Sequence, residues 1–552
     1  MADRREIINL LYNIADLLEF KGENPFKVNA FRNGANVIRK LGDQFDIYLK
    51  QKRLGEVKGI GKGLQSVIYD YAEKGESSEL KSLLADIPET ILELFTIHGL
   101  GPKKIKVLYD ELGIKSIGEL EYACKENRIA LLKGFGKTTQ EKILAELEKR
   151  KFFSNYVLLN QADKIANEIE SELLSIKAVK LIARTGELRR IREIISEIEF
   201  VVLIDKEKPF IEHFEVLDKE NNRILIKTNY QIPVSISITQ DNASFEKELF
   251  LTTGSDEFLS KCGFDFVKLK GKNENDFFKS LKMDYVIPEM REEEYFSLKE
   301  KVRKNSDLEI NKMQGLLHFH TTYSDGRDTL ESMIREAKKL GFKYAAVCDH
   351  SKSAFYANGL TEERILEQKK LLKKYTDENH FTIYQGIESD ILTDGSLDYS
   401  NDFLKNIDFV VASVHSQFNL SEADMTKRII KAVENPYTDL LGHPTGRLLL
   451  SRDSYKCDVK KIIDACAANN VAIEINSNPR RLDLDWRWIF YARNKGCMFS
   501  INADAHSTED LHYTNYGISV ARKGGIQTSE VINCLSADDF KTFLKRKAER
   551  TL

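Results

Sequence analysis

The sequence is poor in the features that mark secreted and membrane proteins. Its 552 residues include seven cysteines with no Cys-x-x-Cys pair, and scattered unpaired cysteines are typical of a reducing compartment. No run approaches the roughly 18 apolar residues that a membrane span needs, and the first residues lead into an amphipathic stretch instead of the apolar core of a signal peptide. We therefore expect a cytoplasmic protein that makes no membrane contact.

The chain also lacks a strong excess of charge of either sign. Its net charge is only −3, so no global attraction to nucleic acid is implied, and any such binding must come from local patches. Apolar residues make up 42% and charged residues 31%, a balance that indicates soluble globular domains. A chain of this length should hold several of them.

The segment 318–326 is the first candidate for chemistry. His318 and His320 stand at i and i+2, and on a regular strand they would project to one face, where two imidazoles can grip one metal ion. The following turn is predicted to bring Asp325 back toward them. Alone the pattern is weak, because a polar strand end near the surface has the same appearance.

Five later apolar runs also end in metal-type ligands, and they lie at 344–350, 383–390, 409–416, 440–447 and 498–507. Helical periodicity fills the stretches between, at 330–340, 362–375, 425–434 and 459–469. Alternating strands and helices predict a parallel sheet, closed into a barrel, whose strand ends meet at one face. Six of the ten histidines occupy such ends, which scattered core histidines would not do.

The N-terminal part is predicted to be helical and carries a repeated glycine device. Gly59, Gly61 and Lys62 form the first copy; Gly99, Gly101, Lys103 and Lys104 form the second. A looser third copy lies at 132–137. A single copy is more often a plain tight turn. Because each copy opens a helix, three copies favour sequence-independent contact with a DNA backbone.

Residues 313–552 resemble the PHP domain, the polymerase and histidinol phosphatase superfamily. The resemblance implies a distorted (β/α)7 barrel with a phosphoesterase site for up to three ions. It implies nine metal ligands: His318, His320, Asp325, His350, Glu388, His415, His443, Asp504 and His506. These ligand types suit Zn²⁺, Mn²⁺ or Fe²⁺, and clustered ions can activate water while clamping phosphoryl oxygens.

The same resemblance implies how the ligands are shared. One ion would take His318, His320, Glu388 and Asp504; a second would share Glu388 with His415 and His443; the third would take Asp325, His350 and His506. The residues expected to act in catalysis are His318, His320, Glu388, Asp504 and His506, with Arg447 and Arg481 near the substrate phosphate. Ordinary surface arginines would give the same pattern as these last two.

Residues 1 to about 300 resemble a bacterial family X DNA polymerase. The segments 24–32 and 59–63 match its small N-terminal domain, and 250–255 and 287–292 match its thumb. The predicted parts are two helix-hairpin-helix domains (1–75 and 76–150), a nucleotidyltransferase-like palm (151–232), a thumb-like part (233–292), a connector (293–312) and the PHP domain (313–552). The fold class is thus multidomain, α/β and α+β.

The palm departs from that family at its active-site positions. Glu187 stands where the family has a triphosphate-binding serine, Glu197 and Glu199 replace an Asp-x-Asp pair, and Ser235 replaces the third aspartate. Mg²⁺ demands near-octahedral carboxylate geometry, so we expect these changes to cripple nucleotide transfer. A lysine used by the family for lyase chemistry aligns with Val67, which cannot form an imine.

The sequence therefore predicts a DNA repair enzyme: a metal-dependent 3′-5′ exonuclease that also cuts at abasic sites and acts as a monomer. Its polymerase half is expected to bind gapped, nicked or 3′-ended DNA. Three alternatives stay open: an active gap-filling polymerase, a histidinol-phosphatase-type enzyme for small molecules, and a DNA-end binder without catalysis.

Overall fold

The computed structural model describes residues 3–42, 44–263, 269–298 and 304–550. The chain divides into two compact units, Met1–Ser154 and Asn155–Leu552. Among the described residues no helix has the length and apolar character needed to cross a membrane.

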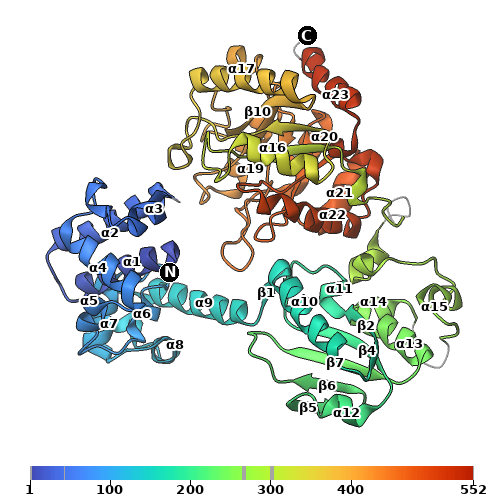
Figure 1. The fold of residues 1–552 in the computed structure, drawn as a ribbon, viewed down its shortest axis with the longest axis horizontal. Helices are drawn as coiled ribbons and strands as arrows, with labels where there is room; N and C mark the ends of the chain where they lie inside the picture. The colour runs from blue at the N-terminus through green and yellow to red at the C-terminus, as the bar shows by residue number, and fades with distance from the viewer. Residues whose placement is uncertain (1–2, 43, 264–268, 299–303, 551–552) are drawn as a thin grey trace. The chain divides into compact units, whose positions relative to one another are not determined.

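The first unit is built from helices (Figure 1). They are α1 (Arg4–Phe20), α2 (Pro25–Leu41), α3 (Gln44–Lys50), α4 (Lys62–Lys74), α5 (Ser78–Leu83), α6 (Ile91–Leu94), α7 (Pro102–Leu112), α8 (Ile117–Lys125) and α9 (Lys137–Ser154), with 3₁₀ turns at Leu54–Glu56 and Ile129–Leu131. Helix α1 begins at a capping box formed by Asp3 and Glu6, which satisfies two otherwise unpaired backbone N–H groups. Its apolar face is fully buried, as the periodicity predicts.

The second unit opens with a mixed five-stranded sheet in the order β2-β4-β7-β6-β5. Its strands are β2 (Val179–Thr185), β4 (Ile198–Ile204), β5 (Val216–Glu220), β6 (Arg223–Ile226) and β7 (Val234–Thr239), and β1 (Val157–Leu158) pairs with β3 (Ile194–Ile195) beside it. The helices of this part are α10 (Leu159–Ser175), α11 (Gly186–Arg189), α12 (Glu207–Ile211), α13 (Asn242–Thr253), α14 (Asp256–Lys261) and α15 (Glu274–Ser280). Strands β4 and β7 run parallel with Glu199 opposite Ser235, so the altered palm positions lie together.

The remainder is a parallel seven-stranded barrel in the order β14-β13-β12-β11-β10-β9-β8. Figure 1 labels its strand β10 and several of its helices. Its strands are β8 (Gly315–Phe319), β9 (Tyr344–Val347), β10 (Thr382–Asp390), β11 (Phe409–Ser413), β12 (Leu440–Leu441), β13 (Ala472–Asn476) and β14 (Phe499–Asn502). Its helices are α16 (Leu330–Lys339), α17 (Glu362–Asn379), α18 (Asn401–Leu404), α19 (Glu422–Val433), α20 (Val459–Ala468), α21 (Trp486–Lys495), α22 (Thr514–Lys523) and α23 (Ala537–Arg550).

The barrel closes where Phe319 pairs with Ala505, and the His320 N–H donates to the Ala505 carbonyl over 2.8 Å. Because all strands are parallel, their carboxyl ends share one face of the barrel. The predicted (β/α)7 architecture and the mixed α/β class are confirmed.

The predicted connector 293–312 lies partly outside the described residues, which omit 299–303. Its described part packs against the rest of the second unit, since Leu298 and Leu308 are buried. Asp307 accepts a hydrogen bond from the Thr528 N–H at 2.7 Å. These buried contacts were not predicted from the sequence, because the segment is rich in charged residues.

Candidate metal centre

All nine predicted ligands converge at the carboxyl end of the barrel strands, with Glu388 of β10 at the centre. His415 Nε2 lies 3.2 Å from Glu388 Oε1, and His443 Nε2 lies 3.0 Å from the same oxygen. On the other side His350 Nδ1 lies 3.0 Å from Glu388 Oε2. Glu388 is fully buried, so its carboxylate is shielded from water and aimed into a shell of imidazoles.

Two clusters in this shell have the size of a metal-binding site. One consists of His318, His320, Glu388 and Asp504, which is the first predicted set; the other consists of His320, Asp325, His350 and His506, which adds His320 to the third predicted set. The ligand atoms within each cluster lie within 4.8 Å of one another.

The remaining predicted set differs in detail. His350, Glu388 and His415 form the third cluster of this size, whereas the prediction grouped Glu388 and His415 with His443. His443 still reaches Glu388, so the position expected for a second ion is bounded by three histidines around one carboxylate.

The histidine pair in β8 does not reach the site by regular strand alternation. His318 has φ +54°, in the left-handed region, and the register of β8 against β9 shifts between Leu316 and Phe319. The prediction that i and i+2 share a face of a regular strand is therefore wrong in its geometry. The two rings nevertheless meet, with centroids 5.5 Å apart, because the distorted backbone redirects His318.

Two further ligand residues carry the same kind of distortion. Asp504 has φ +53° and His443 has φ +25°. Residues without the freedom of glycine cost energy in this region, and such strain persists where the surrounding structure fixes it, often at functional sites. Here the closed barrel and buried hydrogen bonds supply that support.

Three of the histidines are oriented through Nδ1 by a neighbouring acceptor. His318 Nδ1 lies 2.6 Å from Glu474 Oε1, His415 Nδ1 lies 2.5 Å from Asp390 Oδ1, and His506 Nδ1 lies 2.8 Å from the Asp504 carbonyl. An acceptor at Nδ1 fixes the proton there and leaves Nε2 as the electron-pair donor. In all three residues Nε2 is the atom that faces a carboxylate of the cluster.

Three acids of this supporting layer escaped the sequence analysis. Glu474 also accepts from the His443 N–H at 2.6 Å. Asp349 receives the N–H and hydroxyl of Thr321, both at 2.8 Å, and so holds the turn that carries Asp325. The third acid is Asp390, which contacts His415 Nδ1. In the sequence, Glu474 could have been recognised as a lone acid within the apolar strand β13.

The donor set fits divalent metal ions. Among the described residues, five buried ligand-type atoms make no contact with the geometry of a hydrogen bond, although two of them, His350 Nδ1 and Glu388 Oε2, lie only 3.0 Å apart. They are Nε2 of His318, Nδ1 of His320, His350 and His443, and Oε2 of Glu388. Buried polar atoms are ordinarily paired, so these unpaired atoms on the predicted ligands indicate positions suited to a cation. Carboxylate with imidazole is the ligand mixture of Zn²⁺, Mn²⁺ and Fe²⁺ sites.

The electrostatics at Glu388 and His320 agree with this fit. Burial by itself would raise the pKa of Glu388, but the neighbouring imidazoles of His415, His350 and His318 hold that pKa well below its ordinary value. Burial and the nearby His506 and His350 lower the pKa of His320 to about 4. Glu388 and His320 thus have the protonation state that metal binding requires. Although burial opposes it, the carboxylates of Glu388 and Asp390 raise the pKa of His415 to about 10 and that of Asp325 raises the pKa of His506 to about 9, so a metal ion must displace a proton at those two residues.

The two predicted phosphate-binding arginines have different surroundings. The guanidinium of Arg447 is engaged by the Arg481 and Leu482 carbonyls and by Asp485 Oδ2 at 2.5 Å. Arg447 therefore uses three of its five N–H donors to hold the loop 480–485 in place. Arg481 instead points toward the cluster, with Nε 3.7 Å from Asp504 Oδ2.

The glycine turns of the first unit share one geometry in all three copies. The Ile60, Leu100 and Phe135 N–H groups each close a turn onto the carbonyl three residues earlier. The third residue of each turn has a left-handed φ, +99° at Gly59, +85° at Gly99 and +87° at Gly134, as a type II turn requires. The copy at 132–137, loose in sequence, is thus equivalent in structure.

Each turn leads directly into a helix. Gly61 and Gly101 are the N-caps of α4 and α7, and neither helix has a side-chain cap. A Cβ built on either glycine would meet nothing within 4 Å. Uncapped first-turn N–H groups at an open helix start, followed by Lys62, Lys103 and Lys104, are suited to an anion.

In the palm, the three positions of the metal-binding carboxylates surround an arginine. Arg223 Nη2 lies 2.6 Å from Glu197 Oε1 and 3.7 Å from Glu199 Oε1, and its Nε donates to Ser235 Oγ at 3.2 Å. The protein therefore places its own cation among them. Glu187 accepts from the N–H and hydroxyl of Ser196 at 2.7 and 2.9 Å, so its carboxylate holds the segment before β4.

Three family models match the chain. Residues 2–77 match a helix-hairpin-helix domain, residues 91–149 a SAM-like helix-hairpin-helix tandem, and residues 317–478 the PHP domain. The chain is thus a PHP-domain protein with helix-hairpin-helix modules ahead of its barrel.

The DNA polymerase/3′-5′ exonuclease PolX of Bacillus subtilis (strain 168) is 34% identical to this chain, over 98% of the chain and 99% of that protein. The chain therefore belongs to the PolX family, which confirms the resemblance to bacterial family X polymerases with a PHP domain. Shorter relatives match over the barrel: probable phosphatases of Thermoanaerobacter sp. (strain X514), 28% identical over 43% of this chain and 98% of that protein, and of Vibrio atlanticus (strain LGP32), 27% identical over 43% and 94%.

Proposed function

We propose that this protein is a metal-dependent phosphoesterase that removes nucleotides from the 3′ end of DNA during repair. The observation that carries the proposal is the convergence of nine ligand side chains around the buried Glu388, in a chain whose full-length relative is named a 3′-5′ exonuclease. Clustered carboxylates and imidazoles of this kind serve phosphoryl chemistry.

The proposed cofactor is a set of two or three ions of Mn²⁺, Zn²⁺ or Fe²⁺. They would be held by the clusters around Glu388, and bound divalent ions activate water and offset charge on phosphoryl oxygens. The Nδ1 partners keep the imidazoles of His318 and His415 in one tautomer, and Arg481 supplies a guanidinium beside Asp504 for the substrate phosphate.

The proposed partner is DNA with a gap, a nick or a free 3′ end, bound through Gly59, Gly61, Lys62, Gly99, Gly101, Lys103 and Lys104. Phosphate contacts by helix starts and lysines position a protein on DNA without reading its sequence. The proposed domain boundaries are those given by the sequence, and the proposed working state is a monomer in the cytoplasm.

We further propose that the palm does not extend DNA. Arg223 lies among the positions where the polymerase family binds Mg²⁺, paired with Glu197 and close to Glu199. A guanidinium there competes with a metal ion for the same oxygens, and Ser235 adds no charge to bind one. The palm then serves the barrel as part of the DNA-binding half.

One experiment tests both parts. A 5′-labelled primer on a template is incubated with Mn²⁺, with and without nucleotides, beside the His320→Ala variant. Shortening by the wild-type chain but not by His320→Ala, without extension, is the expected result. Elemental analysis of the same two proteins is expected to find two to three ions in the wild type and fewer in the variant.

Two other outcomes would replace the proposal. Template-directed extension that survives His320→Ala would make the chain a gap-filling polymerase; the Bacillus subtilis relative is named a DNA polymerase as well as an exonuclease. Hydrolysis of histidinol phosphate in preference to DNA would make it a small-molecule phosphatase; the shorter relatives are named probable phosphatases.

A further inference from the structure

The turn Phe355–Ala357, between β9 and α17, reverses the usual burial of its residues. Ala354 and Ala357 are buried at 0% and 1% exposure, while Phe355 and Tyr356 between them are 89% and 72% exposed. Large aromatic rings are ordinarily buried and small residues are less demanding. Two adjacent rings left in water therefore indicate a surface kept for a ligand.

This turn lies at the edge of the metal centre. The Tyr356 ring centroid is 6.3 Å from that of His350, and His350 contacts Glu388. The two other described aromatic residues with comparable exposure, Phe26 and Tyr122, belong to the first unit. Within the second unit the exposed aromatic pair thus adjoins the proposed reaction centre.

The backbone beneath the two rings is held firmly. The Ser353 N–H donates to Asp398 Oδ2 at 2.6 Å, and its hydroxyl donates to Asp390 Oδ2 at 2.8 Å. Asp390 is also the acceptor that orients His415. One carboxylate therefore ties the base of the turn to a proposed metal ligand and fixes the rings relative to the site.

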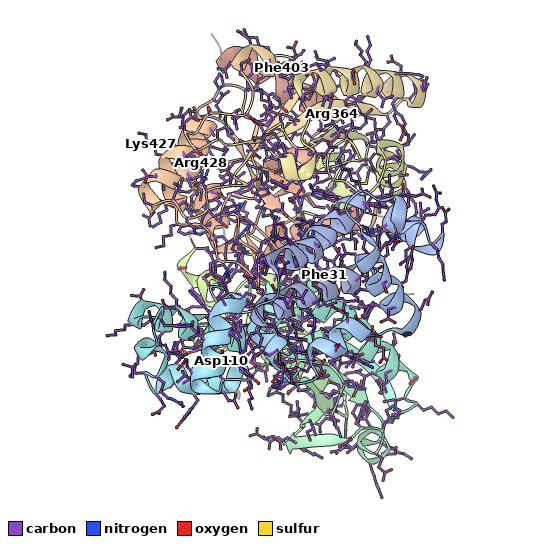
Figure 2. The ribbon with its side chains drawn as sticks, turned by 90° about the vertical axis from the view of Figure 1, so that its left-hand side faces the viewer. Phe31, Asp110, Arg364, Phe403, Lys427 and Arg428 are labelled. Carbon is purple, nitrogen blue, oxygen red and sulfur yellow. The ribbon has the colours of Figure 1, made fainter. Side chains whose placement is uncertain are left out.

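The far end of the turn is held in the same way. Arg364 of α17, labelled in Figure 2, donates to the Asn358 carbonyl at 2.9 Å and to the Tyr323 carbonyl. At Gly359 the two chain segments approach so closely that a Cβ would lie 1.8 Å from the Ser351 carbonyl oxygen. A platform held at both ends presents its rings with little loss of conformational entropy on binding.

We propose that Phe355 and Tyr356 form a stacking subsite for the nucleobase next to the phosphodiester that the metal centre cleaves. The proposal rests on the proposed function and deepens it. An aromatic face accepts any base, because every base has a π-face, and base stacking on such residues is sequence-tolerant. The subsite would select a single-stranded 3′ end, since a base within a duplex is already stacked and paired.

The test uses the full-length protein with Mn²⁺ and two single-stranded oligonucleotides, one ordinary and one with abasic residues at its 3′ end. The double variant Phe355→Ala/Tyr356→Ala is expected to raise KM for the ordinary strand by about tenfold to a hundredfold. Its KM for the abasic strand should stay near that of the wild type, because no base is present to stack. Tyr356→Phe, which keeps the ring, should behave as the wild type.

The outcomes separate this proposal from the proposed function. A wild-type chain that leaves both strands intact contradicts the nuclease itself. A wild type that shortens DNA while the double variant has an unchanged KM overturns the stacking subsite alone. Equal losses on both strands, or a reduced metal content in the variant, would also overturn it, because the turn would then be supporting the metal centre.

Discussion

Glu474 illustrates how one buried residue can organise a site without belonging to its ligand set. Its Oε1 contacts His318 Nδ1 and accepts from Asn502 at 2.9 Å, while its Oε2 accepts from the His443 N–H. It has no exposed surface. One carboxylate thus holds two predicted ligands, His318 on β8 and His443 just after β12. A neutral amide of the same shape would hold them less firmly.

We expect Glu474→Gln to weaken metal binding by about 10- to 100-fold, the usual effect of losing such an orienting partner. Titration of the metal-free protein with Mn²⁺, followed calorimetrically, measures this directly. Glu434→Gln, at an exposed glutamate after α19, is the matched control and should bind as the wild type does. Equal affinities in all three proteins would contradict the orienting role.

Glu199 in the palm has a different electrostatic position. Burial, followed by the nearby Glu197 carboxylate, raises the pKa of Glu199 from 4.5 to about 7, although Arg223 opposes the shift. The folded protein keeps this proton up to about pH 7, whereas the unfolded chain releases it near pH 4.5. Stability therefore falls as pH rises between these values, and the loss persists above pH 7.

The Glu199→Gln variant removes this titration. We expect it to be more stable than the wild type by about 2 kcal/mol at pH 8 and to show no advantage at pH 4. Urea unfolding at a series of pH values from 4 to 8 provides the measurement. A stability difference that does not change with pH would show that Glu199 is not the titrating group.

At the scale of elements, the three glycine turns make a joint prediction. If Lys62, Lys103 and Lys104 each neutralise one phosphate, replacing all three by alanine should reduce the slope of log affinity against log salt by about 2.7. Affinity should fall for every DNA sequence alike. Fluorescence anisotropy with a gapped duplex at several salt concentrations measures both quantities.

The matched control removes the same charge elsewhere. Lys427, labelled in Figure 2, Lys460 and Lys461 lie exposed on α19 and α20, and their replacement by alanine should leave the salt slope unchanged. An equal reduction in both triple variants would assign the effect to net charge and leave the turns a structural role.

Most elements were predictable because their patterns are local. The alternation of apolar runs with helical periodicity located β9 to β12, β14 and the helices between them, and the glycine spacing located the turns. Strand β13 was not among the predicted runs. Its acid, Glu474, is not one of the predicted metal ligands, because it accepts hydrogen bonds from His318 and His443 instead. The left-handed turn at His318 likewise depends on barrel closure, which local sequence does not encode.

The shape of the palm was predictable as well, but its chemistry was only partly so. The replacement of aspartates by Glu197, Glu199 and Ser235 is visible in the sequence. The residue that completes the change, Arg223, lies on β6, and its meeting with them depends on the pairing of β6 with β7. Such long-range contacts follow from topology.

At the scale of the whole second unit, the palm and thumb-like parts are joined to the barrel by buried polar contacts. Lys523 of α22 is fully buried and donates to Glu292 Oε1 at 2.6 Å and to the Arg190 carbonyl at 2.7 Å. Arg487 of α21 meets Glu193 at 2.9 Å. Carboxylates of the polymerase half therefore neutralise positively charged side chains of the barrel.

This arrangement predicts that replacing Glu292 and replacing Lys523 will lower the free energy of unfolding by different amounts. Glu292→Ala leaves the Lys523 ammonium without a carboxylate in a water-free position, and removal of one partner of a buried ion pair typically costs about 3–5 kcal/mol. Lys523→Met should cost less, because Glu292 keeps Arg190 at 3.4 Å and Arg192 at 3.8 Å. Urea unfolding of the full chain, followed by circular dichroism, should show this order.

Because the contact joins the barrel to the polymerase half, Glu292→Ala should also separate one cooperative transition of the second unit into two. A single transition with equal losses in both variants would contradict both expectations, because this contact would then neither set the order of the two costs nor couple the barrel to the polymerase half.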